Sequence, residues 1–142
     1  MNELIYKINN PNSKEIEELE KLRCEIIKID KSNYYLDLLL NGKIIGIGCY
    51  YNNQLIGGAY ISDFLNSIYI EQLFVKEEYQ NNALHIGSSI LKYILENKKI
   101  FSEYYNKNFD TCRLESKNRD SLYSKLGFKK EGNIMGTMKK RL

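Results

Sequence analysis

The sequence predicts an α/β fold, with one domain over residues 1–142 and a mixed, mostly antiparallel sheet flanked by helices. The first observation is that aromatic and β-branched residues make Ile68–Val75 a strand that is apolar on both faces, as central strands are. The second is that strand-like segments joined by short turns precede it. The third is that a helical pattern and another strand follow it, which predicts a central β–α–β unit.

The composition is that of an ordinary globular domain. It is 43% hydrophobic and 27% charged over 142 residues, enough chain for one core. No apolar run approaches the roughly 20 residues of a membrane span, and the N-terminal MNELIYKINN lacks the features of a secretory signal. We therefore expect a cytoplasmic protein without a membrane partner. The net charge of +3 and the basic Lys139–Arg141 do not amount to a nucleic-acid-binding signature, so we expect no nucleic-acid partner.

The three cysteines are Cys24, Cys49 and Cys112. An odd number without C-x-x-C spacing argues against a disulfide framework and against a zinc site, so no metal is expected. The only histidine lies in the central loop, which leaves no Cys–His pair of the kind that nucleophilic catalysis uses. We predict buried structural thiols.

The N-terminal part begins with a short predicted strand, Glu3–Ile8. A break at a proline follows, and Asn12 with Glu15 forms a capping box for a helix that continues to about Ile29. A second short helix is predicted within Lys31–Asn41, ended by an Asn-Gly pair.

Three strands are expected to form an antiparallel meander. Ile44–Tyr51 and Leu55–Ser62 are strand-like and are joined by the turn Asn52-Asn53, while a turn at Leu65–Ser67 leads into the central strand. Glycines within the strands indicate β-bulges or close backbone approaches; they are Gly46, Gly48, Gly57 and Gly58.

A polar loop, Lys76–Leu84, follows the central strand, and a helix begins near His85 or Gly87. A loop that leads into a helix N-terminus presents unpaired N–H groups and a positive dipole end, which suit a phosphate. An ordinary capped helix has the same pattern. Within this β–α–β unit, Ile100–Phe109 remains unassigned, and the returning strand Thr111–Glu115 is expected to run parallel to the central strand.

The C-terminal part holds a short predicted helix and two strands. The helix spans Asp120–Leu126 and is closed by Gly127. The strands are Phe128–Lys130 and Ile134–Lys140, which complete the sheet.

Two motifs carry a resemblance to a known family. Glu71–Val75 followed by His85-Ile86-Gly87-Ser88 resembles the central motif of the GNAT superfamily of N-acetyltransferases, and Leu122–Phe128 resembles its L-Y-x-K-x-G-F segment. There are two departures: His85 stands where the family usually has glycine, and the loop is about two residues longer. The family's Gln/Arg position therefore falls on Gln80 or Asn82, of which Asn82 keeps the spacing into the helix.

The resemblance implies direct transfer of an acetyl group from acetyl-coenzyme A to a primary amine of a small molecule or peptide, in a ternary complex. It places the pyrophosphate on the loop and the helix start, at Asn82, His85, Ile86, Gly87, Ser88 and Ser89. It places the pantetheine arm where Leu73, Phe74 and Val75 separate from the strand Thr111–Glu115, with Ser116 or Asn118 as a hydrogen-bonding partner.

The resemblance also names an acid and a base. Tyr123 would protonate the departing thiolate, since a phenol of pKa about 10 matches a thiolate of comparable basicity; without the following Gly-Phe it would be read as a core tyrosine. Glu71 would be the base, because a carboxylate in an apolar strand has a raised pKa unless it is paired. A salt-bridged glutamate and a water chain are the alternatives, with Gln72 in a supporting polar role.

The amine acceptor is expected near the second helix. Tyr34 and Tyr35, with Asp37, offer aromatic and carboxylate contacts to a cation, although an exposed helix face would look the same. By analogy with the family, a homodimer would form through the C-terminal strands. The alternative function is a non-catalytic acyl-CoA-binding or regulatory module of the same fold.

Overall fold

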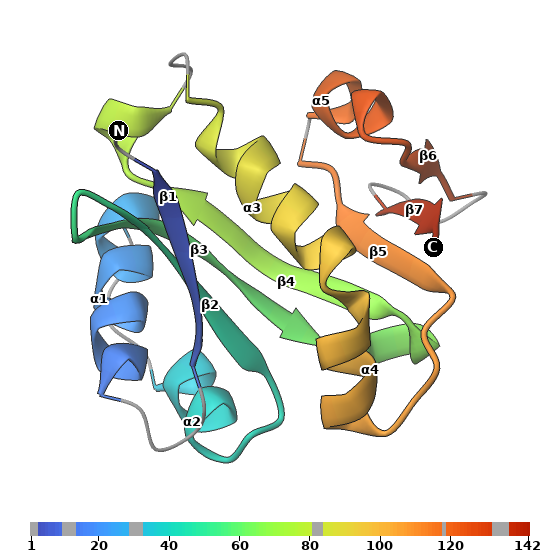
Figure 1. Cartoon of the computed structure of the whole chain (residues 1–142), viewed down its shortest axis with the longest axis horizontal. Coiled ribbons are helices and arrows are strands. Elements are labelled where there is room, and N and C mark those ends of the chain that lie inside the picture. The colour runs from blue at the N-terminus through green and yellow to red at the C-terminus, as the bar shows by residue number, and fades with distance from the viewer. Residues whose placement is uncertain (1–2, 10–13, 29–32, 81–83, 118, 132–136) are drawn as a thin grey trace.

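The computed structural model describes residues 3–9, 14–28, 33–80, 84–117, 119–131 and 137–142. Its seven strands form one sheet in the order β1-β2-β3-β4-β5-β7-β6, so that the predicted central strand β4, Ile68–Val75, has three strands on either side (Figure 1). Among the described strands, β4 and β5, Thr111–Glu115, pair in parallel, and the other pairings are antiparallel. The predicted α/β class, the central strand and the parallel return are confirmed.

The first elements agree with the sequence in type. Strand β1 spans Leu4–Asn9, helix α1 spans Glu15–Ile27 and helix α2 spans Tyr34–Leu40. Helix α1 ends sooner than predicted because Lys28 is in the left-handed region, with φ of 58°. The predicted capping residue Asn12 lies outside the described residues.

Strands β2, Ile45–Tyr51, and β3, Gln54–Ser62, form the predicted meander with β4. The turn between them is confirmed, since Asn52 and Asn53 both have positive φ, as two-residue hairpin turns require. The glycines mark close approaches; a Cβ added at Gly58, for example, would lie 2.5 Å from the carbonyl oxygen of Ile47. Gly57 also borders a register shift, because the β2–β3 pairing passes over Ile56. A second shift lies between Tyr60 and Ile61 in the β3–β4 pair, away from the glycines.

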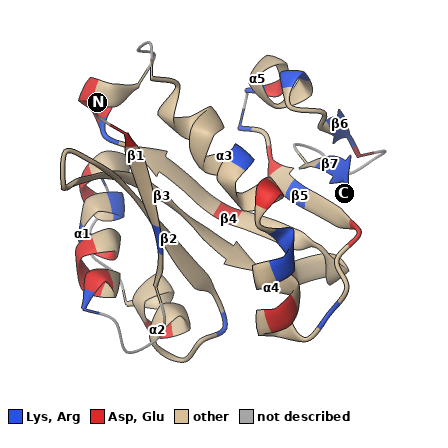
Figure 2. Cartoon of the chain, viewed as in Figure 1, with Lys and Arg blue, Asp and Glu red and all other residues tan. Residues whose placement is uncertain are grey.

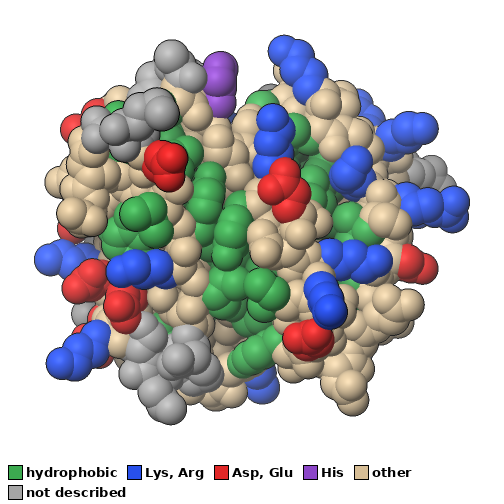
Figure 3. Space-filling view, in the orientation of Figure 1, with side chains coloured by type: hydrophobic (Ala, Val, Ile, Leu, Met, Phe, Trp, Pro, Cys, Tyr) green, Lys and Arg blue, Asp and Glu red, His purple; other side chains and the backbone are tan. Residues whose placement is uncertain are grey.

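Helices cover the sheet on both faces. On one face α1 and α2 bury a cluster with aromatic side chains of β3 and β4, and its members are Ile16, Leu19, Leu22, Leu39, Ile44, Tyr60 and Phe74. On the other, helices α3, Ile86–Glu96, and α4, Lys98–Tyr105, cover the larger core (Figure 1). Figure 3 shows hydrophobic side chains in the middle of this second face and many of the charged ones towards its rim.

Helix α4 is the main element that the sequence analysis left unassigned. Its Phe101 is fully buried, and Tyr105 donates hydrogen bonds to the carbonyl oxygens of Lys43 and Ile61. These contacts join the helix to the core, to the turn before β2 and to β3.

The remaining elements are short. Single 3₁₀ turns occur at η1, Phe64–Asn66, and η2, Glu77–Tyr79. Helix α5 spans Asp120–Lys125, and strands β6 and β7 span Lys129–Lys130 and Thr137–Arg141. Both predicted C-terminal strands are therefore present, and the predicted start of the second, at Ile134, lies outside the described residues.

The thiol prediction is right for two of the three cysteines. Cys49 and Cys112 are buried, whereas Cys24 is only partly buried because it lies on α1 beside the edge of the polar cluster around Glu20. No helix in the described part of the chain has the length and apolarity needed to cross a membrane.

Candidate active site

A bulge in β4 shapes the site. Tyr60 pairs with Gln72 and Ile61 pairs with Ile70, which leaves Glu71 without a partner on β3. The extra residue reverses the alternation of the strand, so that Ile70 belongs to the core under α3 while Phe74 belongs to the cluster under α1. This explains why the strand looks apolar on both faces in the sequence.

A cleft opens between β4 and β5 directly after this bulge. The two strands pair only from Ile68 to Ile70, the last pair being Ile70 with Leu114. From Glu71 to Val75, β4 stays beside β3 and has no pairing with β5. A cavity of about 140 Å³ lies here, lined by Ile70, Glu71, Gln72, Leu73, Leu114, Glu115, Lys117, Arg119 and Tyr123. Free backbone groups and side chains of both signs therefore meet in one place.

Tyr123 enters this cavity from α5. Its side chain is 5% exposed, and its ring lies edge-on to Phe128 with 6.2 Å between the centroids. Burial raises the pKa of the phenol, while the nearby cation of Arg119 acts in the opposite direction. The phenol therefore keeps its proton at neutral pH, as an acid must before it acts.

Glu71 enters the same cavity from the bulge. Its side chain is partly buried, and one carboxylate oxygen accepts a hydrogen bond of 2.9 Å from the hydroxyl of Ser62. The described residues provide no ion pair for it, which disfavours the salt-bridge alternative. The structure thus brings the two predicted catalytic residues together.

The start of α3 has the features of an anion site. His85 precedes the helix with φ of 48°, no side chain caps it, and no acidic residue lies in its first turn. A Cβ added at Gly87 would meet only Val75, at 3.9 Å, so that nothing in the described chain itself requires glycine there. A glycine that leaves open space at a helix start fits the close approach of a phosphate to the backbone.

The loop before α3 is fixed to the end of β4, since the amide of Gln80 donates to the carbonyl oxygen of Val75 at 2.8 Å. This contact gives Gln80 a structural role. Asn82, the preferred alternative, lies outside the described residues.

The predicted phosphate-binding residues divide into two groups. Gly87 and Ser88 are partly exposed and His85 is exposed, whereas Ile86 is buried in the core and contributes only its backbone. The hydroxyl of Ser89 lies 3.5 Å from the carbonyl oxygen of Leu84 and also bonds to the phenol of Tyr6. Ser89 therefore interacts within the fold.

Two residues after β5 were predicted to hydrogen-bond to the pantetheine arm, and the structure describes one of them. Ser116 is buried, and its hydroxyl donates to the carboxylate of Asp120, whose pKa it lowers together with Lys130. Asn118 lies outside the described residues.

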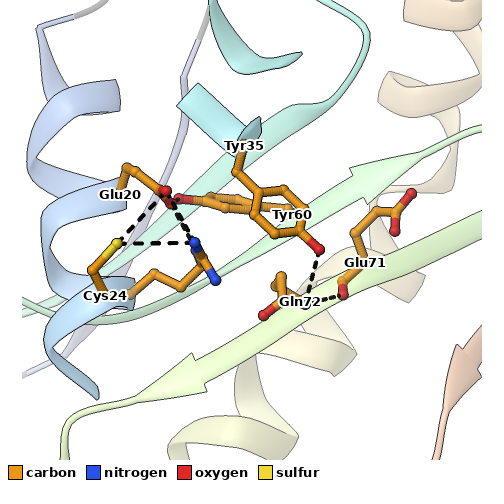
Figure 4. Close-up of polar contacts among 7 residues, drawn as sticks. Glu20, Cys24, Tyr35, Tyr60, Glu71 and Gln72 are labelled. Carbon is orange, nitrogen blue, oxygen red and sulfur yellow. Dashed lines mark hydrogen bonds and ion pairs between the residues drawn. The ribbon is translucent and has the colours of Figure 1, made fainter. Parts of the chain in front are cut away.

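On the acceptor side, the two predicted tyrosines differ. Tyr34 is 64% exposed, whereas the partly buried Tyr35 accepts a hydrogen bond of 3.2 Å from the amide of Gln72, beside Glu71 (Figure 4). Asp37 is exposed on α2. Tyr35 is thus the predicted acceptor residue that is connected to the cleft.

Sequence reasoning missed three charged residues of the cavity: Glu115, Lys117 and Arg119. Both cations lie in a region rich in Lys and Arg around β5, α5 and β6 (Figure 2). No ion pair of Lys117 or Arg119 occurs among the residues that the structure describes. The available signal was their place directly after a strand parallel to β4, because that edge of a sheet collects ligand-binding residues. No group of metal-ligating side chains occurs in the same described part of the chain.

Comparisons with known proteins agree with this geometry. A profile of the acetyltransferase (GNAT) domain matches residues 38–130, more than half of the 142-residue chain. The PaiA N-acetyltransferase of Thermoplasma acidophilum, solved in complex with coenzyme A, is 23% identical with a TM-score of 0.67 and 99% of each chain covered.

Two further solved structures have similar statistics. A GNAT family acetyltransferase from Elizabethkingia anophelis with acetyl-CoA bound is 19% identical, with a TM-score of 0.65 and 98% of each chain covered. Aminoglycoside 6'-acetyltransferase type Ii is 18% identical, with a TM-score of 0.72 and 96% of each chain covered. At these identities the likeness concerns the fold. A search of curated proteins gave no match.

Proposed function

This chain belongs to the GNAT family of acetyltransferases, and we propose that it moves an acetyl group directly from acetyl-coenzyme A to a primary amine of a small molecule or peptide. One observation carries the proposal: Glu71 of the β4 bulge and Tyr123 of α5 line one cavity where β4 and β5 separate. This shared lining supports the proposal that Glu71 acts as proton acceptor and Tyr123 as proton donor in one reaction.

Two features of the chain suit acetyl-coenzyme A. The uncapped start of α3 with the open space at Gly87 would hold its pyrophosphate. The edge of β4 from Glu71 to Val75, which β5 leaves unpaired, would pair with the pantetheine arm. The co-substrate supplies an acetyl group activated as a thioester.

The side chains then manage the protons. The amine nitrogen forms a bond to the acetyl carbon, and the carbon–sulfur bond breaks. Glu71 takes the proton that the attacking amine loses, directly or through water. Tyr123 gives its proton to the departing sulfur, and Arg119 stabilises the resulting phenolate electrostatically, since its charge already favours that form of the phenol.

Calorimetric titration with acetyl-coenzyme A, coenzyme A and dephospho-coenzyme A tests the proposal first, followed by thiol release with a panel of primary amines. We expect micromolar binding of acetyl-coenzyme A and amine-dependent thiol release. Binding without turnover for any amine would favour a non-catalytic acyl-CoA-binding module. Absence of binding at millimolar ligand would overturn both functions. Gly87→Val should abolish binding, because its side chain would fill the open space at the helix start.

A further inference from the structure

Helix α1 contains a buried ion pair that the proposed reaction does not use. Glu20 and Arg23 are each 2% exposed, and the guanidinium bonds both carboxylate oxygens at 2.7 and 3.0 Å. The phenol of Tyr60 donates to the same carboxylate at 2.7 Å. Buried ion pairs are costly to desolvate, and apolar side chains of similar volume often replace them without loss of stability. Stability alone therefore does not account for this pair.

The pair is connected to the cleft through Tyr35. The guanidinium carbon of Arg23 lies 4.4 Å from the centre of the Tyr35 ring, which fixes the ring by a cation–π contact. The Tyr35 hydroxyl accepts from Gln72, whose amide nitrogen also donates to the backbone oxygen of Glu71 at 2.8 Å (Figure 4). Both amide hydrogens of Gln72 are used, so that its side chain has one orientation.

These contacts reach the face of the cleft that lies opposite the anion site. Gln72 lies on the bulged side of β4, towards Tyr35 of α2, and lines the cavity with Glu71. The start of α3 packs on the other face of the sheet, with the core that contains Ile86. A phosphate-bearing ligand on α3 leaves the α1 and α2 face for the amine.

We propose that the buried Glu20–Arg23 pair is a positioning element for the amine acceptor, acting through Tyr35 and Gln72 on Glu71. The inference rests on the proposed function, since it assumes an amine in the cleft. The pair holds Tyr35 in one place, Tyr35 holds Gln72, and the bulge then presents the Glu71 carboxylate to the ammonium without a further ordering cost. Amine affinity therefore depends on the pair, and coenzyme A affinity does not.

The test uses two variants of the full chain and spermidine as the probe amine. Glu20→Leu with Arg23→Met and Tyr60→Phe replaces the cluster by apolar side chains and leaves no buried charge unpaired. Tyr35→Phe removes only the hydroxyl that Gln72 contacts. Spermidine is titrated calorimetrically into protein saturated with coenzyme A, and the affinity for coenzyme A is measured separately.

We expect each variant to weaken spermidine binding about tenfold, the size of one lost hydrogen bond, with coenzyme A affinity within about twofold of the unchanged protein. The combined variant should be no weaker than either alone, because both act through one chain of contacts. The control Lys107→Met with Asp63→Asn removes a surface ion pair and should leave spermidine affinity unchanged.

Three results would overturn the positioning role. They are unchanged spermidine affinity in the apolar variant, equal loss of affinity for both ligands, and strictly additive effects of the two variants. Failure of the unchanged protein to bind coenzyme A would instead overturn the proposed function, which keeps the two failures distinguishable.

Discussion

The two halves of β4 differ in how they are paired, although they belong to one strand of eight residues. Residues Ile68–Ile70 all pair with β5, and Tyr69 and Ile70 also pair with β3 on the other edge. Residues Gln72–Val75 pair with β3 alone, and the cavity borders this half. The first half is joined to its neighbours like any interior strand, and the second presents backbone groups and side chains to the cavity.

One residue separates these behaviours. The bulge at Glu71 turns the strand and ends its parallel pairing, so that an unpaired edge lies inside the sheet instead of at its rim. Unpaired edges usually invite association with another chain. Here the edge faces a narrow cleft that suits an extended ligand arm. The paired half should therefore govern stability and the open half activity.

The largest effect is expected from Tyr123→Phe in the open cleft. Loss of the proton donor should lower kcat by about 10²- to 10⁴-fold, while coenzyme A affinity and the melting temperature change little. Steady-state thiol release and calorimetry measure these quantities. Tyr51→Phe on β2 is the matched control and should be neutral. A Tyr123→Phe enzyme with full kcat would show that a water molecule, not the phenol, protonates the thiolate.

Ile68→Ala in the paired half should reduce stability instead. Ile68 is fully buried opposite Cys112, and removal of such a side chain costs about 2–5 kcal/mol. Activity per folded molecule should persist at low temperature. Leu73→Ala in the open half should show the reverse, with a small stability cost and weaker coenzyme A binding. Denaturant unfolding measures the stability of both variants, and calorimetry measures their affinity for coenzyme A. Equal losses of stability in Ile68→Ala and Leu73→Ala would contradict the distinction between the two halves.

Cys112 of β5, which pairs with Ile68 in the paired half of β4, should make the stability of the fold depend on alkaline pH. Burial raises the pKa of its thiol to about 12 from the ordinary 9.0, with Lys140 acting weakly against the shift. Between these pH values the unfolded thiol has released a proton that the folded one keeps. The free energy of unfolding therefore falls as pH rises, by about 1.4 kcal/mol per pH unit for this group.

Cys112→Val should remove that contribution and make the decline shallower. Denaturant unfolding at pH 8, 9.5 and 10.5 measures the slope. The buried Cys49, whose pKa burial also raises to about 12, keeps its own share and serves as the internal reference. An identical slope in Cys112→Val would refute the assignment.

The elements themselves were predictable because each has a local signature. Alternation and β-branched residues marked the meander, helical spacing marked α1 and α3, and Gly127 marked the end of α5. The ordered motifs around Glu71 and Tyr123 also indicated which side chains meet, since a parallel return places them at one edge of the sheet.

Features that depend on distant partners were not predictable. The register shift at Glu71 arises from pairing with β3. We looked for bulges at glycines in the sequence, and Glu71 has no glycine beside it. Helix α4 contacts remote parts of the chain, since Phe101 is buried in the core and Tyr105 donates to two distant carbonyl oxygens. The Glu20–Arg23 pair reads in sequence as two solvated charges on a helix, and only burial under α2 makes it a structural cluster.

Gly87→Ala tests the start of α3, beside Val75 of the open half, with a small change. Alanine in a helix is favoured over glycine by about 1 kcal/mol, and the added methyl has room at 3.9 Å from Val75. Stability should therefore rise while coenzyme A affinity falls, because the methyl occupies the approach to the backbone. Gly58→Ala is the matched control, since its methyl meets the Ile47 oxygen and should destabilise the fold. Unchanged coenzyme A affinity in Gly87→Ala would separate the helix start from the cofactor site.

The smallest effect is expected at His85, the residue that departs from the family's glycine. Its φ of 48° and ψ of 54° are left-handed, a region that costs a non-glycine residue about 1–2 kcal/mol. Glycine removes this strain but loses about 0.5–1 kcal/mol through the entropy of the unfolded chain. His85→Gly should therefore stabilise the protein by less than about 1 kcal/mol, and His85→Val should destabilise it, because a branched side chain is most strained there. Melting temperatures of the two variants and the unchanged protein measure this order of stability.

Coenzyme A affinity at pH 8 provides the second readout at this position. It should be the same for the unchanged protein and for His85→Gly, because we propose that backbone N–H groups, and not the exposed imidazole (purple in Figure 3), bind the phosphate. A loss of affinity in His85→Gly would show that the imidazole donates a hydrogen bond to the phosphate. Histidine in place of the family's glycine would then strengthen coenzyme A binding.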